Sequence, residues 1–150
     1  MPRAESTITI RDMSMADYDA VIDLLKPTPG VVLRSADSPA ATARYLERNP
    51  GLSLVAEADT RLVGCLMCGH DGRRGYLQHL AVLPESRRQG IATALVETCL
   101  GRLEELGICK SHVDVFKDNS LAARFWKSRG WRLRDDIDRY SCIRGADDNA

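Results

Sequence analysis

A basic, glycine-containing loop between an apolar strand and an amphipathic helix is the part of the sequence best suited to chemistry. The apolar run 80–83 leads into a proline-marked turn, which is followed by Arg87, Arg88, Gln89 and Gly90. The first turn of a helix has N–H groups without helical partners and the positive end of the helix dipole. Because Gly90 has no Cβ, a phosphate can approach the backbone closely. The loop therefore predicts an anion site, although an ordinary turn with solvated arginines would have the same composition.

The loop does not have the spacing of the common phosphate-binding motifs. Segment 80–92 contains no lysine and a single glycine, which excludes both a Walker A loop and a dinucleotide fingerprint. The pattern Arg87-x-x-Gly90-x-Ala92 instead resembles the Arg/Gln-x-x-Gly-x-Gly/Ala signature of the GNAT superfamily of N-acetyltransferases. A second pattern, Asn119-x-x-Ala122-x-x-Phe125-Trp126-x-x-x-Gly130-Trp131, is similar to another GNAT segment at identical spacing.

The hydrophobic periodicity predicts alternating strands and helices in one α/β (α+β) unit. Strands are expected at 7–11, 52–58, 61–70, 76–83, 110–116, 131–133 and 140–143. Helices are expected after a Ser14–Asp17 capping box, from Ser38 to Asn49, from 88 to 106, and from Asn119 to Gly130, with a loop at 31–37. This order implies a single mixed, mostly antiparallel sheet with helices on both faces. It is also the element order of the GNAT fold, so the resemblance covers nearly the whole chain.

The composition limits the classes of protein and partner. At 150 residues, one domain is expected over 1–150, with an ordered core at about 7–144. Lys and Arg total 21, as do Asp and Glu, so neither a nucleic acid nor a membrane is expected as a partner. The sequence has no membrane-spanning apolar run, and its first residues resemble no secretory signal, which predicts a cytoplasmic protein.

The five cysteines predict buried, reduced thiols rather than a metal site or a redox pair. Cys65 and Cys68 form a Cys-x-x-Cys, but on a strand their side chains would point to opposite faces. No second cysteine pair and no His-x-x-x-His pattern accompanies them. No metal ligand is therefore assigned.

The resemblance implies that an acetyl group moves from acetyl-CoA directly to a primary amine of a small molecule or a protein. In the family, the loop backbone holds the pyrophosphate, and a bulged strand that diverges from its neighbour pairs with the pantetheine arm and offers an N–H to the thioester oxygen. Carried onto this sequence, the pyrophosphate residues are Arg87, Arg88, Gln89, Gly90, Ile91 and Ala92, and the strand residues are Leu80, Ala81 and Val82. These strand residues could equally be part of the hydrophobic core, with or without a role in binding. Asn119 would bond the pantetheine amide or simply cap its helix.

The proton acceptor is left open between several groups. An ammonium with a pKa of about 10.4 costs about 4.6 kcal/mol to deprotonate at pH 7, so a base or a water chain is needed. Asp114 lies five residues before Asn119, where some family members have a catalytic Glu, and His79 and Tyr76 are rivals on the preceding strand. Ordered water alone is the remaining candidate.

The proton donor is where the sequence departs from the family. Trp126 occupies the usual tyrosine position, and an indole N–H donates a hydrogen bond but does not ionise. Trp126 is therefore expected to be a wall of the cofactor channel. The departure keeps open the alternative that the protein is a catalytically silent acyl-CoA-binding module. Transfer of a longer acyl chain is a further alternative.

The amine acceptor would be selected by residues 26–38, 71–75 and the last predicted hairpin. A homodimer is compatible with the resemblance, and the oligomeric state is not readable from the sequence.

Overall fold

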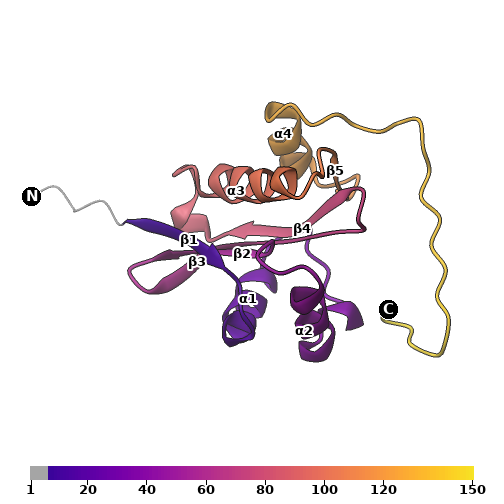
Figure 1. The fold of residues 1–150 in the computed structure, drawn as a ribbon, viewed down its shortest axis with the longest axis horizontal. Helices are drawn as coiled ribbons and strands as arrows, with labels where there is room; N and C mark the ends of the chain where they lie inside the picture. Colours follow the sequence, from indigo (N-terminus) through magenta and orange to yellow (C-terminus); the bar gives the residue numbers. More distant parts are fainter. Residues whose placement is uncertain (1–6) are drawn as a thin grey trace, which may run out of the picture.

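The protein forms one five-stranded sheet with helices on both faces, as the computed structural model of residues 7–150 shows (Figure 1). The strands follow one another across the sheet in the order of the chain. Their bounds are β1 (Ile8–Asp12), β2 (Leu54–Ala58), β3 (Arg61–His70), β4 (Gly75–Val82) and β5 (Ser111–Val113). β1 to β4 pair antiparallel, and β4 pairs with β5 in parallel. The predicted mixed, mostly antiparallel sheet is confirmed. The first six residues, where no secretory signal is expected, lie outside the described part.

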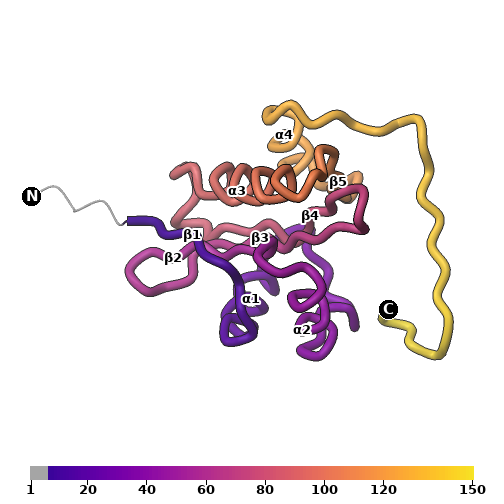
Figure 2. Tube along the Cα trace, viewed as in Figure 1, coloured from indigo at the N-terminus to yellow at the C-terminus, as the bar shows by residue number. Residues whose placement is uncertain are grey.

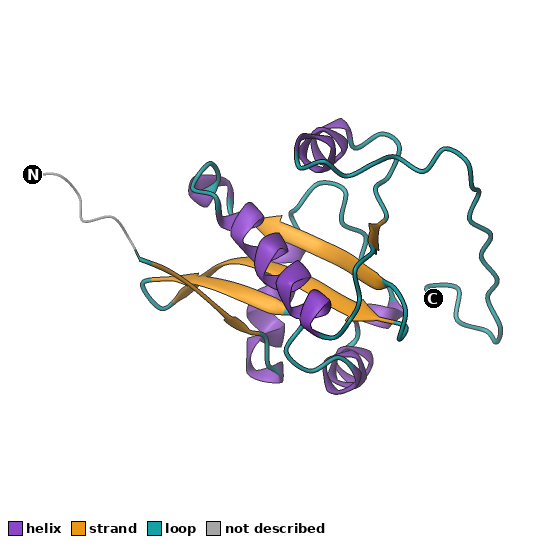
Figure 3. Ribbon diagram, turned by 45° about the horizontal axis from the view of Figure 1, so that its top comes forward, coloured by secondary structure: helices purple, strands orange, loops and turns teal. Residues whose placement is uncertain are grey.

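Two layers of helices cover the sheet (Figures 1 and 3). The longer elements are α1 (Tyr18–Leu25), α2 (Pro39–Arg48), α3 (Ile91–Glu105) and α4 (Ser120–Ser128). Three single turns of 3-10 helix are η1 (Met15–Asp17), η2 (Ser35–Asp37) and η3 (Pro84–Ser86). One apolar cluster packs α3 and Trp126 of α4 onto the sheet, and a second packs α1 onto the opposite face. None of the helices in residues 7–150 is long and apolar enough to cross a membrane.

Local capping chemistry sets the helix ends as predicted at several places. The Ser38 hydroxyl accepts from the Ala41 N–H at 3.2 Å, with Pro39 in the first turn of α2. The Asp17 carboxylate accepts from the Ser14 N–H at 2.9 Å, which confirms the capping box ahead of α1. Gly107 follows α3 with a φ of 83°, a left-handed end that glycine adopts without strain. These short-range signals therefore position the helices.

α3 begins three residues later than predicted. Arg88 and Gly90 both have left-handed φ angles, of 66° and 76°, and a right-handed helix cannot include such residues. The basic residues thus form a loop ahead of the helix rather than its first turn. Gly90 becomes the N-cap, and Ile91 is the first helical residue.

The two strands predicted at 131–133 and 140–143 are wrong. Residues 129–150 contain no strand, and nearly all of them are exposed, Tyr140 to 92%. Figure 2 shows this segment leaving α4 and passing outside the sheet to end on the side of α2. Short alternation alone does not make a strand, because backbone N–H and C=O groups need a neighbouring strand to pair with. β5 is likewise shorter than predicted, with only Ser111–Val113 paired to β4.

The cysteines partly follow the prediction. Cys65 and Cys68 are buried on opposite faces of β3, in the cluster under α1 and the cluster under α3 respectively. Cys99 is also buried, and all five thiols are free. Cys109 and Cys142 are exposed, so the prediction that the cysteines are buried is wrong for these two. Burial raises the pKa of the Cys65 thiol to about 12, which keeps it protonated and unreactive.

We expect Asp17→Asn to destabilise the protein at neutral pH by about 1.5 to 2 kcal/mol. This is the lower end of the about 1.5 to 3 kcal/mol that hydrogen bonds to charged groups contribute, because the Arg11 side chain is 39% exposed. The guanidinium of Arg11 donates to both Asp17 oxygens, at 2.7 and 2.9 Å, and holds the pKa of Asp17 below its usual value against the opposing effect of burial. A carboxyl whose folded pKa is depressed stabilises the fold above its unfolded pKa of about 3.9 and stops doing so as pH falls through the folded value. The difference from wild type should therefore be full at pH 7 and shrink below about pH 4.

Urea unfolding between pH 7 and pH 3 measures this difference. Asp23→Asn, at an exposed carboxylate on α1, is the matched control and should leave the free energy of unfolding nearly unchanged. A constant Asp17→Asn difference across that pH range would contradict the linkage.

Candidate active site

A cleft opens where β4 and β5 diverge. The two strands pair only over Gly75–Leu77 and Ser111–Val113. Beyond this point the cleft has a volume of about 940 Å³ and is bordered by β4, by the chain leaving β5, by α4 and by the α1–α2 connection. It is bordered by all three histidines of the chain, His70, His79 and His112. The divergence expected from the resemblance is therefore present.

A β-bulge turns the middle of β4 toward this cleft. Gln78 pairs with Met67 and Ala81 pairs with Cys65, so His79 and Leu80 together face the single residue Leu66. His79 has a φ of 54°, an uncommon conformation for a residue other than glycine. Bulges re-aim side chains next to active sites. Here the bulge brings both His79 and Leu80 to the border of the cleft.

The three strand residues assigned to the pantetheine arm differ in where their side chains lie. Leu80 is half-buried and borders the cleft, while Ala81 and Val82 are buried in the core. Ala81 and Val82 could thus meet a cofactor only through their backbone. The core role and the binding role considered for these residues are compatible with each other.

The basic loop has the geometry of an anion cradle. The first helical hydrogen bond of α3 runs from the Ala94 N–H to the Gly90 carbonyl at 2.9 Å, so the N–H groups of residues 91–93 precede the helical pattern. Arg87, Arg88, Gln89 and Gly90 are all exposed. A Cβ added to Gly90 would meet no atom within 4 Å, so the space in front of the loop is open. Ile91 is buried and Ala92 is half-buried, which anchors the start of the helix.

His79 is held by a carboxylate from the other side of the cleft. Its Nε2 lies 2.7 Å from Oδ1 of Asp37 in η2, and both side chains are about 85% buried, with 14% and 15% exposed. The second Asp37 oxygen accepts from the Arg34 N–H at 2.9 Å. Sequence reasoning placed 31–37 in a loop and missed Asp37. The helical-turn pattern around Ser35–Asp37 is the local signal that could have identified it.

Asp114, the other proposed base, has a different environment. Its carboxylate is 70% exposed and pairs with the Arg139 guanidinium at 2.7 Å. Both groups border the cleft. Tyr76, the third candidate, is exposed. Its ring lies tilted against that of His112, with ring centroids 5.7 Å apart, and its hydroxyl donates to Asp71 at 3.4 Å. Of the three candidates, His79 has the most enclosed position.

Trp126 forms part of the cleft wall and of the core. It is 7% exposed and packs edge-on against Phe125 and Trp131, with ring centroids 5.1 and 4.6 Å away. Its indole N–H makes no hydrogen bond within residues 7–150, and no side-chain nitrogen or oxygen in that range is both buried and unpaired. The N–H is therefore accessible from the cleft that Trp126 borders. This position agrees with the expected channel wall.

Asn119 caps α4, with its Oδ1 accepting from the Ala122 N–H at 3.1 Å. Its amide nitrogen lies against Gly30 of the α1–α2 connection, where an added Cβ would come within 2.1 Å. The capping role considered for Asn119 is thus present. The close approach also places its amide at the border of the cleft.

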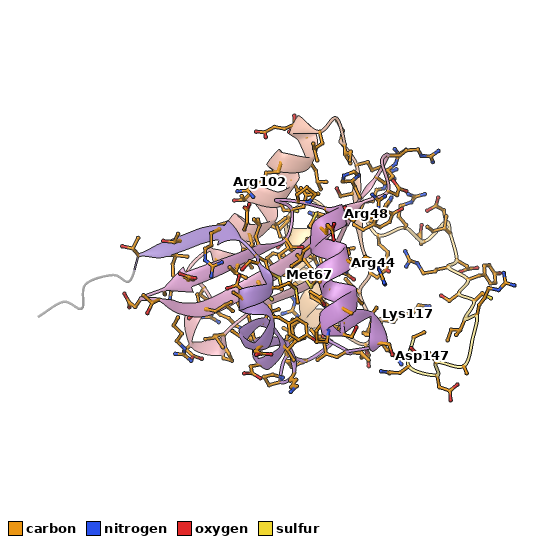
Figure 4. All side chains as sticks on the ribbon, turned by 60° about the horizontal axis from the view of Figure 1, so that its bottom comes forward. Arg44, Arg48, Met67, Arg102, Lys117 and Asp147 are labelled. Carbon is orange, nitrogen blue, oxygen red and sulfur yellow. The ribbon has the colours of Figure 1, made fainter. Side chains whose placement is uncertain are left out.

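Tyr45 and Arg48 of α2 were missed by sequence reasoning. Both border the cleft from the side of the helix, together with Arg34 of the α1–α2 connection. Burial raises the pKa of Tyr45, which therefore stays a neutral hydroxyl. Figure 4 labels Arg48 together with Arg44, one turn earlier on α2, which does not border the cleft. Nothing in the local sequence distinguishes Arg48 from an ordinary solvated helix arginine.

Residues 18–131 match the model of the acetyltransferase (GNAT) family. The chain belongs to this family. Acetyltransferase ECA0875 of Pectobacterium atrosepticum is 38% identical over 129 residues, covering 85% of this chain and 90% of that protein. Acetyltransferase YE1169 of Yersinia enterocolitica is 31% identical over 134 residues, with the same coverage. The resemblance on the two motifs is confirmed.

Solved structures confirm the GNAT fold. PaiA N-acetyltransferase from Thermoplasma acidophilum, in complex with coenzyme A, superimposes with a TM-score of 0.76 at 21% identity, covering 86% of this chain and 92% of that one. Aminoglycoside N-acetyltransferase AAC(6')-Iy, also in complex with CoA, gives a TM-score of 0.71 at 19% identity, covering 95% and 98%. This GNAT protein is thus an acetyltransferase by family, and its fold is one that binds CoA in these neighbours.

Proposed function

We propose that this GNAT protein transfers an acetyl group from acetyl-CoA directly to a primary amine of a small molecule or a protein. The observation that carries the proposal is the order of features along one stretch of chain: the bulge at His79 and Leu80 borders the cleft, and β4 ends two residues later at Val82, ahead of the open, basic loop that precedes α3. A thioester at the bulge and a pyrophosphate at the loop would be the two ends of one bound molecule. Direct transfer needs the thioester and the amine side by side, which such a cleft provides.

The residues present fit acetyl-CoA as a co-substrate. Backbone N–H groups of Gly90, Ile91 and Ala92, with the side chains of Arg87 and Arg88, would hold the pyrophosphate. The backbone of 80–82 would pair with the pantetheine arm as an added strand does, and Asn119 would bond its amide. A backbone N–H at the bulge would stabilise the oxyanion that forms on the thioester oxygen.

We propose His79 as the general base. His79 takes one proton from the substrate ammonium, so that the neutral amine nitrogen can bond to the thioester carbon. The carbon–sulfur bond then breaks to release CoA thiolate, and the nitrogen loses its second proton to solvent. The thiolate then takes a proton from solvent, because the indole of Trp126 cannot supply one. His79 is preferred to Asp114 because it lies at the bulge and is held in one orientation, whereas Asp114 is solvated and paired with Arg139. We place the reaction in the cytoplasm, where the five free thiols would stay reduced.

Acetylation of a panel of amines, with release of free CoA as the readout, tests this function. The panel should include small polyamines, aminoglycosides, free amino acids and peptides with a free N-terminus or a lysine. A parent protein that binds acetyl-CoA and releases CoA with none of these amines would favour a silent binding module instead, the alternative that Trp126 suggests. Comparison of acetyl-CoA with longer acyl-CoA donors tests the remaining alternative.

We expect Trp126→Tyr to keep or raise kcat, because a phenol adds a proton donor at the position that the family commonly uses. Trp126→Phe should keep kcat within about threefold and cost about 1 to 2 kcal/mol of stability through lost packing against Phe125 and Trp131. Initial rates, the Kd for CoA and thermal unfolding measure the three effects. A Trp126→Phe variant that binds CoA normally but is inactive would show that the indole N–H itself supports the transition state.

A further inference from the structure

We propose that Asp37 is a positioning residue that fixes the tautomer of His79, so that Nδ1 is the nitrogen that accepts the proton in the cleft. The inference rests on the proposed function, in which His79 is the base. It begins from the 2.7 Å contact between His79 Nε2 and Asp37 Oδ1. An ionised carboxylate can only accept a hydrogen bond, so Nε2 carries the proton in the neutral imidazole. The lone pair is then on Nδ1.

Nδ1 is available to a substrate. No residue in 7–150 makes a hydrogen bond to it, since the single side-chain bond of His79 is the one to Asp37. No described side-chain nitrogen is both buried and unpaired, so Nδ1 reaches accessible space. The residue borders the cleft, and its side chain is 14% exposed. The small exposed part of the ring thus includes the atom that would act as base.

Asp37 is itself held firmly enough to act as a support. One carboxylate oxygen accepts the Arg34 N–H at 2.9 Å, closing the η2 turn, which leaves the other oxygen directed at His79. The Asp37 carbonyl accepts from the Tyr18 hydroxyl at 2.6 Å, and the Ser35 N–H donates to the Asn149 carbonyl at 2.9 Å. Apart from the contact with His79, η2 is therefore tied to α1 and to the C-terminal segment. A carboxylate held in this way keeps the imidazole in one orientation.

The charged groups that border the cleft do not replace Asp37. Arg34 and Arg48 carry positive charge and cannot accept the Nε2 proton, and the Tyr45 hydroxyl is neutral. Asp71 accepts from the N–H groups of Arg73 and Arg74 in its own hairpin turn. Asp114 is paired with Arg139 from the C-terminal segment. Asp37 is thus the one carboxylate in residues 7–150 with an ion pair to His79.

The bulge in β4 explains why the imidazole of His79 needs a hydrogen-bond partner to fix its orientation. At a bulge the side chain no longer follows the alternation of the strand, and the left-handed φ of 54° turns it out of the core register. An imidazole in this position has two tautomers of similar energy in the absence of a partner. A carboxylate at Nε2 selects the tautomer with a basic Nδ1.

Long-range proton–nitrogen correlation NMR of ¹⁵N-histidine-labelled protein tests the tautomer directly, without acetyl-CoA or any amine. His79→Gln assigns the ring signals among the three histidines. We expect protonated Nε2 and unprotonated Nδ1 in the neutral imidazole of the wild type. In Asp37→Asn, the amide can keep the Arg34 contact and donate to Nε2, so the proton should move to Nδ1. Asp37→Glu should keep the wild-type tautomer, and Asp23→Asn on α1 should change nothing.

A double-mutant cycle then tests the link to catalysis. Asp37→Asn should lower kcat by on the order of a hundredfold in the wild-type background and by less than about twofold in the His79→Gln background. Asp37→Glu should recover at least about tenfold of the Asp37→Asn loss. An Nδ1–H tautomer in the wild type, or equal losses in both backgrounds, would overturn the proposal. A parent with the expected tautomers that acetylates no amine would instead refute the proposed function and leave the His79–Asp37 geometry standing.

Discussion

His79→Gln is expected to lower kcat by on the order of a hundredfold at neutral pH while the Kd for CoA stays within about twofold. Loss of a general base costs about 10² to 10⁴ in rate, and glutamine keeps much of the shape of histidine but cannot accept a proton at this pH. Rate and affinity should separate because the pyrophosphate is proposed to bind at the basic loop and not at the bulge. Steady-state kinetics with the best amine of the panel, together with calorimetry for CoA, measures the two quantities.

His70→Gln is the matched control, because His70 also borders the cleft but accepts a hydrogen bond from the Gly72 N–H at the hairpin turn. It should keep kcat within about threefold. Asp114→Asn extends the comparison to the other candidate base. A hundredfold loss in Asp114→Asn with an unaffected His79→Gln would reverse the assignment and make Asp114, acting through water, the base.

Gly90→Asp is expected to weaken CoA binding at least about tenfold, which corresponds to about 1.4 kcal/mol. The carboxylate would project into the open space in front of the loop and repel the pyrophosphate at the start of α3. The substitution adds no steric conflict, because no atom lies within 4 Å of the new Cβ. Aspartate also tolerates the left-handed backbone better than most residues, so the fold should be retained.

Gly90→Asn separates the charge from the backbone effect, because asparagine has the same shape and the same tolerance of a φ of 76°. It should bind CoA several times more tightly than Gly90→Asp, and this difference should shrink at high salt. Equal affinities of the two variants and the wild type by calorimetry would remove the loop from the binding site.

The elements that local chemistry defines were predicted from the sequence with little error. β3 was placed at its observed bounds, since its long apolar run has to be buried on both faces of the sheet. The ends of α2 and α4 followed from Ser38 and Asn119, whose side chains cap the next turn of backbone. The spacing of Arg87, Gly90 and Ala92 located the open loop ahead of α3, whose role in binding CoA stays a prediction. Each of these signals acts within a few residues, so the linear sequence contains it completely.

The segments that depend on a distant partner were predicted poorly. Residues 131–133 and 140–143 alternate like strands, but neither pairs with a neighbour, so the alternation produced no strand. The start of α3 was displaced because Arg88 adopts a left-handed φ that arginine does not favour by itself. Pairing and strain of this kind are set by the surrounding structure rather than by propensity.

The sequence by itself determined the family, the order of the elements as far as α4 and the loop proposed to hold CoA, because motif spacing, capping and periodicity are local properties. Only the tertiary structure decided which groups face the cleft and how they are held. The contact between Asp37 and His79 spans 42 residues and exists because a bulge in β4 turns His79 toward η2. Such a contact depends on strand register and on the path of the α1–α2 connection, and these are fixed only when the sheet and both helical layers pack together.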